Sequence, residues 1–190
     1  VILGSLLILA AIVFMVVFIP YADRNESPSE IFRTRARQES AGRAIYIQNG
    51  CVYCHSQSIR SIDWGLGAER IAQAGDYIAD HPILLGSQRT GPDLSQAGGE
   101  HPDDWHMAHF INPRYTRPNS IMPTFRFLGQ KNTRSLTAYV QSLGLLQADR
   151  RIERQHFWKK EAVRAYEAGP DANVRWLNDQ IPRGWREVPN

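Results

Sequence analysis

The chain has 190 residues, of which 43% are hydrophobic and 22% are charged, enough for one domain of ordinary size with attachments. Its formal net charge is only +3, and lysines and arginines are spread along the chain without a run of five or six like charges. These properties argue against a nucleic-acid partner, because a binder of that class normally carries a basic patch or tail.

The first segment, residues 1–19, contains no charged residue, and only Gly4 and Ser5 dilute its apolar run. A helix of this length spans roughly 28 Å, close to the hydrocarbon core of a bilayer. A buried core helix and the apolar region of a signal peptide are the alternatives. That region is usually about 7–15 residues long with small residues at a cleavage site, which Phe18–Tyr21 does not offer. The sequence therefore predicts an uncleaved transmembrane anchor in contact with membrane lipid.

Residues 20–36 are predicted to form a polar linker and the start of a helix. Ser27, Pro28 and Glu30 resemble a helix N-terminus, with a capping residue, a proline in the first turn and an acid three residues on. From residue 31 to residue 49 the pattern is helical and free of proline, and Gly50 supplies a C-terminal stop.

Directly after Gly50 comes Cys51-Val52-Tyr53-Cys54-His55, the pattern by which a c-type haem is covalently attached. Cys51 and Cys54 would form two thioethers, and His55 would be the proximal iron ligand. A thioredoxin-like motif would need a βαβ context and a zinc site a second ligand pair, and neither is present. A plain disulfide would leave His55 unexplained. We therefore predict one haem c, which in bacteria is attached outside the cytoplasmic membrane, so the soluble domain is expected in the periplasm.

Residues 58–94 lack periodicity and are rich in glycine, as expected of loops that wrap a haem. In class I cytochromes c, a Gly-Pro follows the attachment motif; the proline carbonyl accepts the N–H of the proximal histidine, and a nearby leucine contacts the ring. Pro92 and Leu94 are the candidates for these two positions. A ligating histidine usually needs such an acceptor to fix its orientation. The alternative is an ordinary β-turn with proline at its second position.

The sixth iron ligand is predicted to be Met122, which precedes Pro123 and lies not far from the C-terminal helix, as axial methionines do in class I domains. A thioether raises the reduction potential relative to a second imidazole. The other candidates are Met107, His101, His106 and His109. Most of them lie in an expected short helix over residues 102–111, where core packing is the simpler explanation. A metal site at His106 and His109 rests on only two ligands.

A second helix is predicted from Thr133 to Leu143, ended by Gly144. Its apolar residues recur at i, i+3, i+4 and i+7: Leu136, Tyr139, Val140 and Leu143. We expect this helix to cross the helix before the haem motif, with Gly42 permitting close approach. A further amphipathic helix is expected over residues 149–168, followed by a tail with Trp176, Ile181 and Trp185. Together with Trp158, these side chains favour docking of residues 149–190 on a partner subunit.

Three strings carry a more specific resemblance: Ala41–Arg60, Gly86–Gly99 and Asp103–Phe125. In this order behind an N-terminal anchor, they resemble the monohaem subunit II of cbb3-type cytochrome c oxidases, which belong to the haem-copper oxidase superfamily. The resemblance covers roughly residues 40–128 and does not extend beyond Gly144. It implies an all-α chain with a class I cytochrome c domain over residues 37–148.

The resemblance also assigns residues. It implies that Cys51 and Cys54 attach the haem and that His55 and Met122 ligate its iron. It further places Arg60, Arg89 and Trp105 in the family's haem-proximal motifs. Either arginine could pair with a haem propionate, since guanidinium and carboxylate match bidentately; a solvated surface arginine is the alternative.

The expected function is therefore single-electron relay from a donor, a cytochrome or a quinol-oxidising complex, to an integral membrane haem-copper subunit that reduces oxygen to water. The chain itself is expected to do no bond-making chemistry. Three alternatives remain open: the equivalent subunit of a nitric oxide reductase, a free-standing anchored shuttle, and a haem-based gas sensor or peroxidase with an open sixth site.

Overall fold

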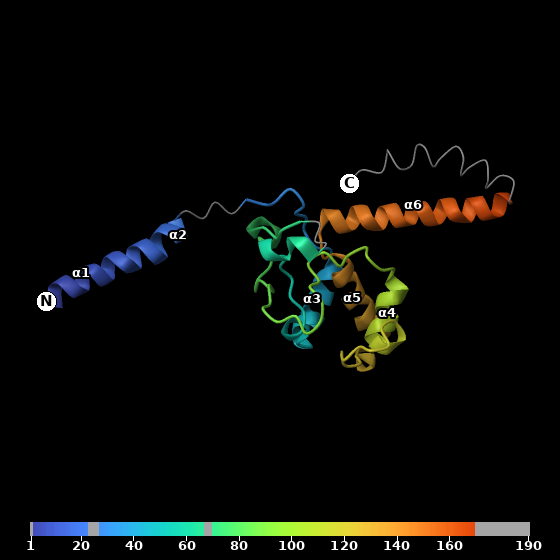
Figure 1. Cartoon of the computed structure of the whole chain (residues 1–190), viewed down its shortest axis with the longest axis horizontal. Coiled ribbons are helices and arrows are strands. Elements are labelled where there is room, and N and C mark those ends of the chain that lie inside the picture. The colour runs from blue at the N-terminus through green and yellow to red at the C-terminus, as the bar shows by residue number, and fades with distance from the viewer. Residues whose placement is uncertain (1, 23–26, 67–69, 170–190) are drawn as a thin grey trace.

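A computed structural model describes residues 2–22, 27–66 and 70–169, with side chains left undescribed at residues 64–66. It begins with one continuous apolar helix, formed by α1 (Ile2–Val13), a π-helical turn (Phe14–Phe18) and α2 (Ile19–Ala22) (Figure 1). The helix runs past Pro20, beyond the expected end at residue 19. The wider π turn just before Pro20 relieves the clash that a proline ring makes with a regular α-helix.

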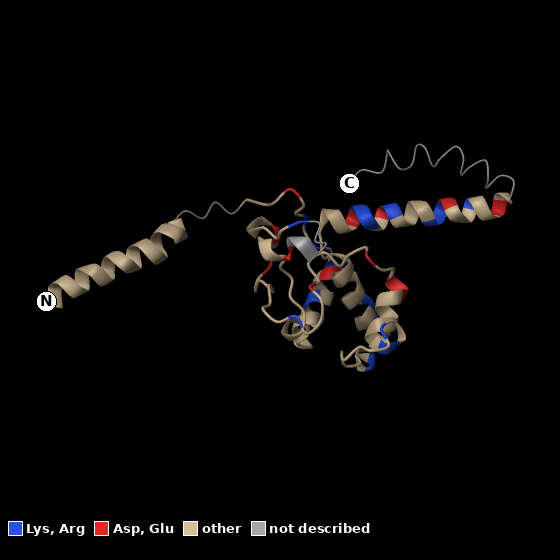
Figure 2. Ribbon diagram, viewed as in Figure 1, with Lys and Arg blue, Asp and Glu red and all other residues tan. Residues whose placement is uncertain are grey.

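This helix is the only one in the described residues that is long and apolar enough to cross a membrane. It has 21 residues and a mean hydropathy of 3.1. None of its side chains is buried, and it bears no Lys, Arg, Asp or Glu (Figure 2). By length and composition it matches a membrane anchor.

The predicted helix start before residue 37 is wrong. Helix α3 spans Arg37–Gln48, and residues 32–36 are irregular. The helix begins at Arg37 because the Glu39 carboxylate accepts the Ala36 N–H at 2.7 Å. Glu39 also binds the Arg33 guanidinium at 2.8 and 2.9 Å, which holds the preceding chain outside the helix.

Residues 27–36 instead form a segment that lies on the domain, here called the strap. Ile31 is buried, and its carbonyl accepts the Leu146 N–H at 3.0 Å. Arg33 donates to both carboxylate oxygens of Asp149, at 2.5 and 2.9 Å. The strap, which follows the anchor in the chain, is thereby bound to the start of the last helix.

Helices α3 and α5 (Gly129–Gln141) pack closely on one another, as predicted (Figure 1). A Cβ at Gly42 would lie 1.9 Å from the Ser135 carbonyl oxygen and 2.7 Å from the Tyr139 Cβ. The rings of Tyr46 and Tyr139 meet edge to face, with centroids 5.3 Å apart. Only a residue without a side chain permits this approach of the two backbones.

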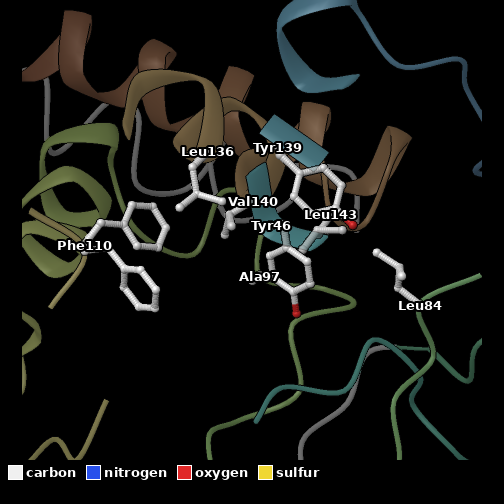
Figure 3. Packing of buried hydrophobic residues seen from close by; sticks show 9 residues of the cluster. Tyr46, Leu84, Ala97, Phe110, Leu136, Tyr139, Val140 and Leu143 are labelled. Carbon is white, nitrogen blue, oxygen red and sulfur yellow. The ribbon is translucent and has the colours of Figure 1, made fainter. Parts of the chain in front are cut away.

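The hydrophobic core lies between these helices and α4 (Asp103–Ile111), which contributes Phe110 (Figure 3). All four periodic residues of the predicted C-terminal helix are buried in it, so the amphipathic pattern is confirmed. The other members come from α3 and the loops: Tyr46, Leu84, Ala97 and Phe125.

Between the haem motif and α4, the described chain forms loops with short 3₁₀ turns at Ser61–Leu66 and Ala74–Tyr77. Two further turns, Pro113–Tyr115 and Arg126–Leu128, connect α4 to α5. No strand occurs in residues 2–22, 27–66 or 70–169, so the all-α prediction is confirmed.

The last helix, α6, spans Leu146–Ala168 and starts three residues earlier than expected. Its first turns lie on the domain: Ala148 is buried, and Arg151 Nε donates to the Gly98 carbonyl at 2.8 Å. The rest extends away from the domain and carries charges of both signs (Figures 1 and 2). Trp176, Ile181 and Trp185 lie outside the described residues.

Candidate haem site

The two cysteines lie in a tight turn directly after α3. Gly50 has a φ of +69°, a left-handed conformation that ends the helix, and Cys51–Tyr53 then forms one 3₁₀ turn. The Cys54 and His55 amides both donate to the Cys51 carbonyl, at 3.2 and 3.0 Å. This turn brings the two thiols and the imidazole into one short stretch of backbone.

The two sulfurs have different surroundings. Cys51 is half-buried against the hydrophobic core, and burial raises the pKa of its thiol to about 11. Cys54 is exposed, and no disulfide joins it to Cys51. One sulfur therefore lies at the edge of the core while the other is open to solvent.

The His55 ring is held by a second loop. Its Nδ1 lies 2.8 Å from the Pro92 carbonyl oxygen. Gly91 packs on the ring so closely that a Cβ there would lie 2.2 Å from Cε1, so only glycine fits. With Nδ1–H donating to the carbonyl, Nε2 carries the lone pair that could ligate iron.

Met122 lies at another edge of the same core, against which Cys51, Val52 and Leu94 also pack while remaining partly open. Its backbone is held by the Ser120 hydroxyl, which accepts the Met122 N–H at 3.2 Å, and by Arg114, which donates to the Met122 carbonyl at 3.3 Å. The backbone that carries the thioether is thus held by two hydrogen bonds.

The residues around this site fit a haem. The partly open apolar side chains that border the core are those that a porphyrin would cover. Ile121, next to Met122, and Phe127, five positions after it, are 77% and 73% exposed. Isolated exposed apolar residues are normal, but partly open apolar side chains on one core that also bears Met122 suit a large apolar ligand.

By the sequence, Arg60 or Arg89 could pair with a haem propionate or lie solvated at the surface. In the structure both bind Asp63, a carboxylate that sequence reasoning did not single out: Arg60 Nε at 3.0 Å and Arg89 Nη2 at 2.7 Å from Oδ2. These hydrogen bonds, that from Arg60 first, lower the pKa of Asp63 well below its usual range. The signal available in the sequence was the i, i+3 spacing of Arg60 and Asp63.

Helix α4 carries Trp105, His106 and His109, and His101 lies just before it. The Trp105 ring stacks between His101 and His109, with centroid distances of 3.9 and 4.8 Å. His109 Nδ1 also lies 2.6 Å from the Thr116 hydroxyl. These contacts account for the two histidines as packing residues.

His106 is buried on the inner side of α4. Burial lowers its pKa to about 4; nearby His101 and His109 lower it further, whereas Asp103 opposes them. The described ranges contain no group of three or more His, Cys, Asp or Glu side chains that could hold a metal ion. The structure therefore adds no third ligand to the pair His106 and His109.

A comparison with protein-family models matches residues 1–171 to the family described as cytochrome c oxidase, mono-haem subunit/FixO. A search of curated proteins found no match. The family match continues to residue 171, so it includes α6. The expectation that the resemblance stops at Gly144 is therefore wrong.

Proposed function

Because this chain belongs to the family of mono-haem subunits of cytochrome c oxidase, FixO, we propose that it relays single electrons to the catalytic haem-copper subunit of a respiratory oxidase that reduces oxygen to water. The single observation that carries the proposal is the His55–Pro92 contact of 2.8 Å, since it orients an imidazole directly after a Cys-x-x-Cys pair as an iron ligand requires. The donor would be a cytochrome or a quinol-oxidising complex.

In this proposal Cys51 and Cys54 form thioethers with one haem c, and His55 Nε2 and the Met122 sulfur hold its iron. A haem held in this way supplies a one-electron Fe(III)/Fe(II) couple. The chain's own contribution is to set the potential through the two ligands and to keep the imidazole aligned through Pro92. The partly buried side chains of Leu94 and Val52 would limit the access of water to the haem.

The Ile2–Ala22 helix is consistent with an anchored subunit. We place the domain on the periplasmic side of a bacterial cytoplasmic membrane, because haem c is attached there. Fusion of a reporter enzyme that is active only outside the cytoplasm to the C-terminus should give an active fusion. An inactive but stable fusion would contradict this orientation.

The ligand assignment is tested by replacing Met122 with alanine and with histidine in the full chain. Met122→His should keep a six-coordinate iron but lower the reduction potential, because imidazole is a stronger donor than a thioether. Met107, partly buried on α4, provides the matched control, and Met107→Leu should leave spectrum and potential unchanged. An unchanged potential in Met122→His, or a lowered one in Met107→Leu, would refute the choice of Met122.

Covalent attachment has a separate test. Haem staining of the denatured chain on a gel should be positive for the wild type and lost when both Cys51 and Cys54 are replaced by alanine. Staining that survives the double substitution would show that the haem is not held by thioethers.

For docking to the rest of the oxidase we propose α6. Its projecting part exposes Phe157 at 55% and Tyr166 at 84%, and such rings commonly anchor interfaces. Replacing both with serine should reduce copurification of the catalytic subunit in mild detergent, whereas Glu153→Ser on the same helix should not. Equal recovery in both variants would contradict docking through α6. A copurifying nitric oxide reductase, or no copurifying haem subunit, would refute the proposed oxidase.

A further inference from the structure

Asp93, the residue after Pro92, ties together the two loops that meet at His55. Its side chain is only 9% exposed. One oxygen, Oδ2, accepts from the Ser56 hydroxyl at 2.6 Å and from the Ser58 N–H at 2.8 Å. The other, Oδ1, accepts from the Ser95 N–H and hydroxyl, at 2.8 and 2.5 Å. Oδ2 is thus bound by residues 37 and 35 positions earlier in the chain, and Oδ1 by Ser95, two positions on.

Two backbone hydrogen bonds fix the same register on either side of Pro92. The Gly91 N–H donates to the Cys54 carbonyl at 2.9 Å, and the Leu94 N–H donates to the Ser56 carbonyl at 2.8 Å. The Pro92 carbonyl, with its contact to His55, lies between them. Pro92 itself has no N–H to donate. The carboxylate of the next residue, Asp93, therefore links the two loops at this point through its side chain.

Arg89 adds further hydrogen bonds to the network around Asp93. Its Nε donates to the Ser56 hydroxyl at 2.7 Å, and its Nη2 donates to the Ser58 carbonyl and to Asp63. The guanidinium lies 3.5 Å from Asp93 and so partly balances its charge. Hydrogen bonds to ionised groups are stronger than neutral ones, so this cluster is a firm support for the loops.

We infer that Asp93 is a positioning residue that holds the Pro92 carbonyl against His55 Nδ1. The inference rests on the proposed haem function. A firm Nδ1–H···O=C hydrogen bond raises the basicity of a ligating imidazole, which favours Fe(III) and lowers the potential. Loosening the bond therefore raises the potential. Ser56 and Ser58 act with Asp93, whereas Asp63 meets the loop through Arg89, at 2.7 Å, rather than through Asp93 or Pro92.

The test uses the full-length haem-loaded chain in detergent, with Asp93→Ala and the milder Ser56→Ala. NMR of the reduced state gives the exchange rate of the His55 Nδ1 proton, with the Val140 amide in the core as an internal reference for folding. Asp93→Ala should speed this exchange by at least about tenfold relative to Val140 and raise the reduction potential, because hydrogen bonds to a charged acceptor are lost. Ser56→Ala should shift both quantities less, in the same direction.

Asp63→Asn is the matched control for charge. It removes the charge of a buried carboxylate but keeps a side-chain oxygen that can accept from Arg89. It is therefore expected to raise the potential while leaving the exchange of the His55 proton near the wild-type rate. If the His55 Nδ1 proton in Asp93→Ala and in Ser56→Ala exchanges at the wild-type rate relative to the Val140 amide, the inference is overturned while the proposed function stands. Absence of bound haem from the wild-type chain would overturn the proposed function and this inference with it.

Discussion

The close crossing of α3 and α5 makes Gly42→Ala the sharpest test of the fold. The added Cβ would lie 1.9 Å from the Ser135 carbonyl oxygen, about 1.5 Å short of the 3.4 Å at which ordinary contact begins. The obstacle is backbone on the opposing helix, so no side-chain rotation relieves it. Overpacking of this kind costs about 3 kcal/mol at the upper end of the usual range, and alanine regains about 1 kcal/mol of helix propensity. The free energy of unfolding should therefore fall by about 2 kcal/mol.

Urea unfolding of the full chain in detergent, followed by far-UV circular dichroism, measures this change. With a slope of about 2 kcal/mol per M, the midpoint should fall by about 1 M. Ser40→Ala, at an exposed position of the same helix, is the control and should stay within about 0.5 kcal/mol of wild type. If both variants unfold at the wild-type midpoint, the close approach of the helices at Gly42 is not what the structure indicates.

Three further changes probe contacts that support the site. Tyr139→Phe removes the hydroxyl that donates to Gln57 Oε1 at 3.0 Å in the interior, so the same unfolding assay should show a loss of about 1 kcal/mol, and a gain would contradict this hydrogen bond. The folded-state pKa of His106, about 4, lies below its value of 6.5 in the unfolded chain, so unfolded molecules bind more protons and stability should decrease as pH falls from 6.5 to 4. His106→Gln should flatten that decrease, and an unaltered pH profile would argue against a buried neutral imidazole. Arg33→Gln breaks the ion pairs to Asp149 and Glu39, so limited proteolysis should cut the strap faster than in wild type; equal cleavage rates would show that Arg33 does not hold it.

Local sequence was sufficient for the features that depend on neighbouring residues. Residues 1–19 carry no charge and only Gly4 and Ser5 dilute their apolar run, which alone predicts a membrane-length helix. The spacing of Leu136, Tyr139, Val140 and Leu143 predicted a buried helix face, and all four are in the core. The pentapeptide at Cys51–His55 is contiguous, so the proposed attachment site could be read from five letters.

Only the tertiary structure decided what depends on residues far apart in the chain. The helix expected from residue 31 begins at Arg37: Glu39 caps it at Ala36, and Arg33, bound to Glu39 and to Asp149 116 positions away, holds the preceding chain outside the helix. No periodic signal encodes that contact. The same holds for Asp93, whose partner Ser56 lies 37 positions earlier. Sequence composition supplies the groups that can bond, but which carboxylate meets which donor is fixed when the loops fold against one another, where a buried charge must be paired.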